Sequence, residues 1–377
     1  MFRVKIAAVN GRNTEKTEAA RVYTTKTAKP KRKKEKRKQP RTAKKGQGIK
    51  MITATRTAET ATTTTTTATV TSEKFGIEIE FNNINRAKAA EIINTTLNGT
   101  LTENDILNIY VIEDQQGRKW TITRDSSIEG PADEECELAT PPIYTADLPI
   151  LKEIITSLKA AGAKSSNARH CGIHLHIDSS KHTPKTIRNL VNIMAAHEDQ
   201  LFKAFEVDEQ RIRNYCKRAE KIFVEKINQN KVETVRELED AWYRYNGPCT
   251  HREDHYHRSR YHALNLHALF TRYHTVEFRF AQWTEETSMD WTVLESFIRI
   301  CLAMSELARK AKSASFKRQS DWTSAYSFRC WLLRLGFIGE DTKDVRKFLL
   351  KNFEGTKAWR RGAERGTRNG TENGAAA

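Results

Sequence analysis

Glutamate, histidine, asparagine and arginine side chains alternate with apolar residues in five short segments of this sequence. An apolar residue at every second position is typical of a β-strand that buries one face. A strand face that only meets water usually carries Thr, Lys, Ser and Gln, whereas these faces carry side chains that bind metal ions and phosphate. The pattern therefore favours a binding site across one face of a sheet over a plain solvent face. The segments are residues 75–81, 135–139, 170–178, 261–267 and 275–280.

The polar residues of these segments are of the types that hold a hard divalent cation and a phosphate group. Carboxylate oxygens with an imidazole favour Mg²⁺ or Mn²⁺. The guanidinium of Arg279, two residues after Glu277, could form two parallel hydrogen bonds to a phosphate near that metal. No GxxxxGK[ST] loop occurs, so this is not the sequence of a P-loop enzyme. The candidate residues are Glu78, Glu80, Glu137, His174, His176, Asn265, Glu277 and Arg279.

The segments between the predicted strands have the periodicity of amphipathic helices. Pro184 is expected in the first turn of the longest helix, where a missing N–H does no harm. A further strand is predicted at 119–123, before the turn at 124–127. Strands interleaved with helices predict an α+β fold. Helices are predicted at residues 86–97, 148–161, 184–205, 211–223, 232–245, 291–311, 324–335 and 344–353.

Positive charge is concentrated at the start of the chain. Residues 1–50 carry +15 of the total formal charge of +17, so the remaining residues are close to neutral at +2. The basic block at 29–38 could bind RNA, an anionic membrane surface or an import receptor, or remain a solvated tail without a dedicated partner. A Thr- and Ala-rich tract with an unbroken run from Thr62 to Thr67 follows, and such a composition cannot bury a core. Met51 offers an alternative start that would remove the basic block.

These changes in composition divide the chain into four predicted parts. They are a disordered basic tail and Thr-rich linker at 1–72, a catalytic domain at 73–315, a C-terminal helical extension at 316–354 and a disordered tail at 355–377. No apolar run approaches the roughly 18 residues of a membrane-spanning helix, and no secretory signal precedes the folded part. The six cysteines are scattered without a CxxC pair. A cytoplasmic protein with reduced thiols is expected, although the basic start leaves nuclear or mitochondrial targeting open.

Seven short motifs follow one another along the sequence. They are 75–81, Trp120 with 125–128, 137–142, 171–176, Tyr215-Cys216, 260–265 and 276–279. In this order they resemble the amidoligase family, a branch of the carboxylate–amine ligases related to glutamine synthetase and glutamate-cysteine ligase. The resemblance covers roughly residues 74–310.

This resemblance implies a fold, cofactors and a reaction. The fold would be like that of the catalytic domain of glutamine synthetase, a curved antiparallel β-sheet with helices on its convex face. ATP and Mg²⁺ or Mn²⁺ would bind on the concave face. The enzyme would phosphorylate a carboxylate to an acyl phosphate, and an amine would then attack it to form an amide or isopeptide bond. The carboxylate and the amine could each belong to a small molecule or a peptide.

The resemblance also implies a role for each candidate residue. The implied metal ligands are Glu78, Glu80, Glu137, His174 and Glu277. The implied nucleotide contacts are His176, Arg279 and Asp125, and the implied catalytic residues are Arg279, Glu277 and Asn265.

Several residues also have simpler interpretations. Glu277 and Arg279 could be an ion pair along one strand, and Asp125 could cap a turn. His251, His255 and His257 have the spacing of a metal cluster, but they lie in a charged segment that is better interpreted as a flexible loop over the substrate.

Two other classes of protein are compatible with the sequence. In a zinc hydrolase, His174, His176 and Glu137 would hold Zn²⁺ and Glu80 would act as the general base. A nucleic-acid-binding protein would act through the basic residues 26–50. The small net charge of the remaining chain counts against this last class.

Overall fold

The structure is a computed structural model that describes residues 73–104, 109–246, 251–318 and 320–358. The predicted tail and linker at 1–72 lie outside the described residues, as does the C-terminal tail from residue 359. Within the described residues, no helix is both long enough and apolar enough to cross a membrane.

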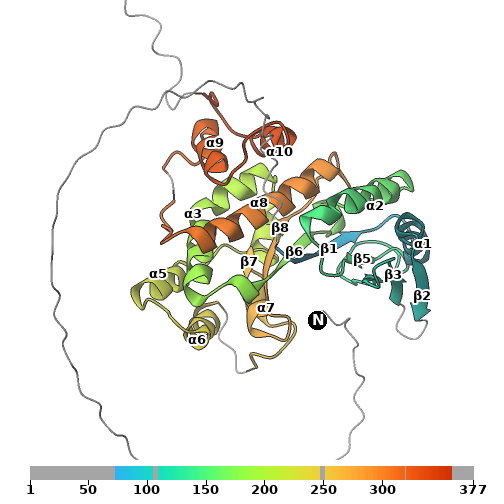
Figure 1. Ribbon diagram of the computed structural model, residues 1–377, viewed down its shortest axis with the longest axis horizontal. Coiled ribbons are helices and arrows are strands. Elements are labelled where there is room, and N and C mark those ends of the chain that lie inside the picture. The colour runs from blue at the N-terminus through green and yellow to red at the C-terminus, as the bar shows by residue number, and fades with distance from the viewer. Residues whose placement is uncertain (1–72, 105–108, 247–250, 319, 359–377) are drawn as a thin grey trace, which may run out of the picture. The chain divides into compact units, whose positions relative to one another are not determined.

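An antiparallel sheet of eight strands forms the centre of the described part (Figure 1). The strand order is β2-β3-β4-β5-β1-β6-β8-β7, with β2 and β7 at the two edges. The first strand, β1, therefore lies inside the sheet and pairs with β5 on one side and β6 on the other. The strands are β1 Phe75–Phe81, β2 Thr100–Asn104, β3 Ile109–Glu113, β4 Lys119–Thr123, β5 Cys136–Ala139, β6 Ile173–Asp178, β7 Leu264–Asn265 and β8 Thr275–Ala281.

Several helices begin at a residue whose side chain accepts a hydrogen bond from a free backbone N–H of the first turn. The side chain of Asn85 accepts a hydrogen bond of 2.8 Å from the N–H of Lys88 at the start of α1, and Asn98 ends that helix in the left-handed conformation with φ of 47°. Thr183 caps α3 directly before Pro184. The helices are α1 Arg86–Leu97, α2 Leu148–Ala160, α3 Pro184–Ala204, α4 Glu209–Asn214, α5 Lys221–Gln229, α6 Val235–Tyr245, α7 His267–Phe270, α8 Trp291–Lys310, α9 Ala325–Arg334 and α10 Lys343–Leu349.

Helices cover the apolar face of the sheet. The apolar residues of β1, which are Phe75, Ile77, Ile79 and Phe81, are at most 1% exposed. Helix α1 contacts β2, β3 and β4, α8 contacts β6, and α2 packs between α1 and α8. Figure 1 shows α2, α3 and α8 along one side of the strands. Because side chains alternate between the two faces of a strand, the polar residues of β1 lie on the opposite face.

The C-terminal helices pack onto α3 and α8. The ring of Trp331 in α9 stacks on that of His197 in α3 with 3.8 Å between their centroids, and the rings of Phe328 and Phe353 stack at 4.4 Å. Helix α10 contacts α8. The helices predicted at 324–335 and 344–353 are thus present within a few residues of the predicted bounds.

The predicted α+β class is confirmed, and the structure differs from the predicted elements in three places. The helix predicted at 211–223 is two helices, α4 and α5, because the N–H of Lys217 bonds to the carbonyl of Tyr261 and the carbonyl of Lys217 accepts from Ala263. The strand predicted at 261–267 is only the two residues of β7, and α7 follows it. The hairpin of β2 and β3 was not predicted because β2 is largely exposed and has little apolar periodicity.

Candidate active site

The strand register brings the candidate residues opposite one another on the polar face of the sheet. Strand β1 supplies Glu78 and Glu80, and each has a direct partner on a neighbouring strand. Directly opposed residues on one face of an antiparallel sheet have Cβ atoms about 5 Å apart, so their side chains can share a ligand. The opposed pairs are Glu78–His174, Glu80–Glu137, His176–Glu277 and Asn265–Glu277.

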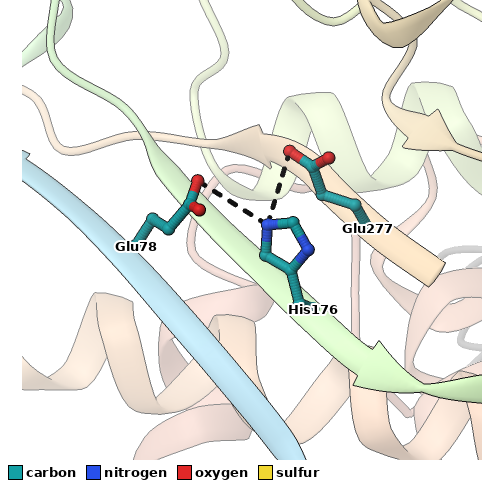
Figure 2. A group of neighbouring side chains, drawn as sticks. All are labelled: Glu78, His176 and Glu277. Carbon is teal, nitrogen blue, oxygen red and sulfur yellow. Dashed lines mark ion pairs between the residues drawn. The ribbon is translucent and has the colours of Figure 1, made fainter. Parts of the chain in front are cut away.

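Glu78, His176 and Glu277 form a first group of metal-binding side chains, the His176 group (Figure 2). Nε2 of His176 lies 3.6 Å from Oε2 of Glu78 and 3.8 Å from Oε1 of Glu277. On the other side of the ring, Nδ1 of His176 lies 3.1 Å from the hydroxyl of Thr275, which fixes the ring orientation. Within the described ranges, the buried Nε2 atom has no hydrogen-bond partner. The hydrogen bond at Nδ1 suits a metal-binding histidine, whose second nitrogen is normally held in this way, and the two carboxylates at Nε2 also suit an ion pair with a protonated ring.

Glu80, Asp125 and Glu137 form a second group, the Glu80 group, whose carboxylate oxygens lie within 4.8 Å of one another. Oε2 of Glu80 accepts a hydrogen bond of 2.6 Å from the backbone N–H of Gly172, which orients the carboxylate. Asp125 belongs to the turn after β4, and its Oδ1 accepts from the N–H of Ser127 at 2.8 Å. Asp125 therefore caps the turn and also faces the two glutamates.

His174 lies between the two groups. Its Nδ1 is 3.3 Å from Oε2 of Glu78, and its Nε2 is 3.7 Å from Oε1 of Glu80. The Oε1 atom of Glu277 is 4.0 Å from the same Nδ1. His174 thus connects the two groups into one continuous polar surface.

Both oxygens of Glu277 are held by neighbouring side chains. Oε1 accepts a hydrogen bond from Nη1 of Arg279, and Oε2 accepts one of 2.7 Å from Nδ2 of Asn265. The Oδ1 atom of Asn265 in turn accepts from the N–H of His267 at 2.8 Å. Arg279 is 5% exposed, and no described residue forms a hydrogen bond with its Nε. The ion pair between Glu277 and Arg279 considered from the sequence is present, and the arginine keeps a free donor.

The protonation states in the His176 group follow from its charges. Burial raises the pKa of Glu78, but His176 and His174 outweigh it and hold that pKa well below its ordinary value. Burial also raises the pKa of Glu277, but Arg279 and His176 bring it down to about 2. The pKa of His176 is lowered by burial and raised more strongly by Glu277 and Glu78, so it lies above its ordinary value. Both glutamates of this group are therefore ionised at neutral pH.

Glu80 and His174 are shifted in the other direction. Burial, with Asp125 nearby, raises the pKa of Glu80 to about 7 in spite of the charge of Arg211. Burial and the charge of Arg279 lower the pKa of His174 to about 4, so His174 is neutral at neutral pH. A neutral imidazole can bind a cation, whereas an imidazolium cannot.

The structure brings all the predicted site residues together, with two differences of detail. His176, predicted as a nucleotide contact, shares the first group with two carboxylates, whereas His174 lies between the groups. The segment 251–260 contributes no residue to either group among the described residues. His257 is 3% exposed, and its Nδ1 lies 2.8 Å from the hydroxyl of Ser259, so it is a packed residue.

Two residues near the site were missed by the sequence analysis. Thr275, which holds the ring of His176, is an ordinary first residue of a strand and gives no signal. Arg211 is 5% exposed, and its Nη2 donates to the carbonyl of Arg279 at 3.3 Å. Its position four residues before Tyr215, in the fifth of the seven motifs, was the available signal.

The comparison with known families agrees with this geometry. Residues 71–304 match the family described as "putative amidoligase enzyme". The match covers more than half of the chain, so the chain belongs to the amidoligase family, a family of ligase enzymes. No curated protein matches the chain.

Proposed function

We propose that this protein is an ATP-dependent carboxylate–amine ligase that requires Mg²⁺ or Mn²⁺ and acts through an acyl phosphate. The observation that carries the proposal is the pair of adjacent carboxylate-rich groups on one sheet face, with the Arg279 guanidinium beside them. Phosphoryl transfer requires neutralisation of the charge on the polyphosphate and fixed positions for the reacting oxygens. Family membership supports the ligase class.

The donor atoms fit a hard divalent cation. The two groups together offer five carboxylates and one imidazole, and oxygen-rich sets of this kind suit Mg²⁺ and Mn²⁺. Nε2 of His176 lies between the two ionised carboxylates of Glu78 and Glu277, and binding of a cation in the His176 group would release the proton from this ring. When bound, the metal ions would hold the phosphate oxygens and neutralise the charge that develops on the transferring phosphoryl group.

The chain's own residues would orient the reacting groups. Asn265 and Arg279 hold Glu277 in one orientation from its two oxygens. The free Nε–H of Arg279 is available to a phosphate oxygen, and a guanidinium stabilises charge that grows in the transition state. In the proposed reaction a carboxylate oxygen attacks the γ-phosphorus and ADP leaves. An amine then attacks the carbonyl carbon of the acyl phosphate, and phosphate leaves with the bridging oxygen.

The zinc hydrolase receives less support from the geometry. Its three proposed zinc ligands are His174, His176 and Glu137. Glu137 shares the Glu80 group, whereas His176 shares the other group with Glu78 and Glu277. A tetrahedral zinc site requires its protein ligands around one point.

The proposed likeness to the glutamine synthetase fold rests on the open antiparallel sheet with helices on one face and metal-binding groups on the other. The basic block that would bind nucleic acid lies outside the described residues. Cytoplasmic location, and a carboxylate and an amine that each belong to a small molecule or a peptide, stay predictions from the sequence.

The proposal is tested by trapping the activated acid. The full-length protein is incubated with ATP, Mg²⁺, hydroxylamine and a pool of carboxylic acids, and the products are analysed by mass spectrometry. We expect hydroxamates and ADP in equal amounts, and neither product after chelation of the metal with EDTA. Turnover of an amide without ATP would support the hydrolase instead, and formation of AMP would contradict the acyl phosphate.

A further inference from the structure

Arg211 is a buried cation that forms no ion pair with a described residue, although it lies near Glu80. It lies on the short helix α4 and is 5% exposed. Its Nη2 donates to the carbonyl of Arg279, and its buried Nε has no hydrogen-bond partner among the residues that the structure describes. Among the described residues, no carboxylate forms an ion pair with it. A buried guanidinium in this state is costly unless an anion completes its hydrogen bonds.

The Arg211 guanidinium occupies the space that a side chain at position 172 would fill. A Cβ atom at position 172 would lie 1.9 Å from Nη2 of Arg211 and 2.6 Å from its Cζ. The guanidinium therefore lies directly against the backbone at Gly172, where only a glycine leaves room for it. The N–H of the same glycine donates to Glu80, so Arg211 is held next to the Glu80 group.

Arg211 is also attached to the strand that carries Arg279. Strands β6 and β8 change register between Ile173 and Leu175, so that Arg279 and Phe280 together oppose His174 in a β-bulge. The carbonyl of Arg279 at this bulge is the acceptor for Arg211. A simple structural interpretation would be that Arg211 only supports the bulge. A hydrogen bond to one carbonyl, however, does not require a positively charged side chain, and it leaves the Nε–H of Arg211 without an acceptor among the described residues.

The charges of the site favour a role for Arg211 in anion binding. Arg279 forms an ion pair with Glu277, whereas no residue in the described part of the chain forms one with Arg211. A guanidinium presents its N–H groups in the planar geometry that phosphate oxygens accept.

We infer that Arg211 is a phosphate-binding residue of this site. Its guanidinium donates a hydrogen bond to a phosphoryl oxygen of the nucleotide, next to the Glu80 group. The inference rests on the proposed ATP-dependent reaction. Arg211 and Arg279 would then hold the phosphoryl groups from two elements, α4 and β8, that are far apart in the sequence.

The first experiment separates binding from folding with Arg211→Gln. The amide of glutamine keeps a donor but loses the charge. Affinities for the magnesium complexes of ADP and of a non-hydrolysable β,γ-imido analogue of ATP are measured by calorimetry, with the unliganded melting temperature as the control for folding. We expect the variant to bind the ATP analogue about 10- to 100-fold more weakly, the usual effect of losing a hydrogen bond between charged groups.

The pattern across the two nucleotides locates the phosphate. Weaker binding of the ATP analogue alone assigns Arg211 to the γ-phosphate, and weaker binding of both nucleotides assigns it to the inner phosphates. Unchanged binding of both by a folded variant would overturn the inference and leave Arg211 as a support for the bulge. If Arg211→Gln does not fold, Arg211→Lys keeps the charge and loses the planar fork. That variant should then show a smaller loss of the same affinity, and wild-type affinity would overturn the inference.

Gly172→Ala supplies an independent test. The added methyl group should displace the guanidinium without removing its charge, because the nearest atoms to that Cβ all belong to Arg211. Gly172→Ala should therefore weaken the binding of the ATP analogue as Arg211→Gln does. The double variant should be no weaker than Arg211→Gln alone, because the clash is gone. Fully additive losses would show that the two residues act separately and would contradict the inference.

Inorganic phosphate distinguishes failure of this inference from failure of the proposed function. If the wild type binds neither nucleotide, the ATP-dependent reaction is wrong. Phosphate binding by the wild type that is lost in Arg211→Gln would then still support an anion site at Arg211. Equal phosphate binding by both proteins, or by neither, would overturn it.

Discussion

Asn265 donates a 2.7 Å hydrogen bond from its Nδ2 to Oε2 of Glu277, the carboxylate oxygen that Arg279 does not contact. The two partners approach Glu277 from different strands and leave it one orientation. Glu277 faces His176 in this orientation, with 3.8 Å between Oε1 and Nε2. Asn265 is therefore a positioning residue for the His176 group.

Asn265→Asp should raise the concentration of Mg²⁺ that ATP turnover requires. The aspartate keeps the oxygen that accepts from the N–H of His267, but it replaces the donor to Glu277 with a second negative charge. The carboxylate of Glu277 should then rotate away from the new carboxylate at position 265. We expect turnover to fall by roughly 10- to 100-fold at fixed Mg²⁺, since misplacement of a positioned group by about 1 Å has effects of this size.

Asn189→Asp is the matched control for this change. Asn189 is 2% exposed and donates from Nδ2 to the carbonyls of Ala308 and Ala311. Its replacement should lower the melting temperature without changing the Mg²⁺ requirement. The same Mg²⁺ requirement in Asn265→Asp as in the wild type would contradict the positioning role.

Glu80→Gln should reduce ATP turnover by about 10²-fold or more while the protein remains folded. The glutamine can still accept from the N–H of Gly172, but it replaces a carboxyl group with a pKa of about 7, which a bound cation would hold in its ionised form. The effect is of the order seen when one group that stabilises a transition state is removed. Glu91→Gln on α1 is the control, since Glu91 is exposed and contacts Lys88. Equal initial rates of ADP formation in the two variants would show that Glu80 has no role in the reaction.

Glu198 should make the protein less stable as the pH rises from about 4.5 to about 7. This carboxyl in α3 is 1% exposed, and burial raises its pKa from 4.5 to about 7 although the N–H of Ala219 donates to it. Below pH 4.5 it is protonated in both the folded and unfolded states. Between the two values the unfolded state releases the proton first, so the free energy of unfolding falls, by about 3 kcal/mol in total.

Chemical denaturation at a series of pH values measures this dependence. Glu198→Gln removes the titrating group, so the variant should lose much of the fall in stability between pH 4.5 and pH 7 that the wild type shows. Parallel pH profiles for the wild type and the variant would show that Glu198 is not the group responsible.

Glu73 should contribute to the stability of the folded protein, whereas the residues before it should not. Its carboxylate is 2% exposed and accepts hydrogen bonds from the hydroxyl of Ser305 at 2.7 Å and from Nη2 of Arg309 at 3.0 Å. Glu73→Gln should destabilise the protein by about 2 kcal/mol, because Arg309 loses its ionised partner.

Deletion of residues 1–72 should change the melting temperature little, since their composition cannot bury a core. A large fall in the melting temperature after this deletion would contradict the prediction that residues 1–72 are a tail and linker.

The central strands of the fold could be predicted from the sequence because apolar residues on one face alternate with polar residues on the other. Strand β1 alternates four buried apolar residues with Gly76, Glu78 and Glu80, so its period of two is unbroken and its predicted bounds are those of the structure. The hairpin of β2 and β3 gives no such signal, because four of the five residues of β2 are exposed. Helix α4 ends early because the following residues pair with residues 261–263, a contact between distant parts of the chain that no local pattern reports.

The residues of the site were predictable, but their division into two groups was not. Alternation identified Glu78, Glu80, His174 and His176 as lying on one face. Which histidine belongs with which carboxylate depends on the register, and the register places His176 opposite Glu277 and His174 opposite Glu78. Arg211 enters the site from a helix, so strand periodicity could not find it.

The transfer of an oxygen atom from the substrate to phosphate tests the central claim most directly. A carboxylic acid identified by the hydroxamate screen is labelled with ¹⁸O in its carboxylate and incubated with the wild-type protein, ATP, Mg²⁺ and hydroxylamine. The account predicts one ¹⁸O atom in each inorganic phosphate, because the bridging oxygen of the acyl phosphate leaves with the phosphoryl group. Unlabelled phosphate, or ¹⁸O found in AMP, would contradict it.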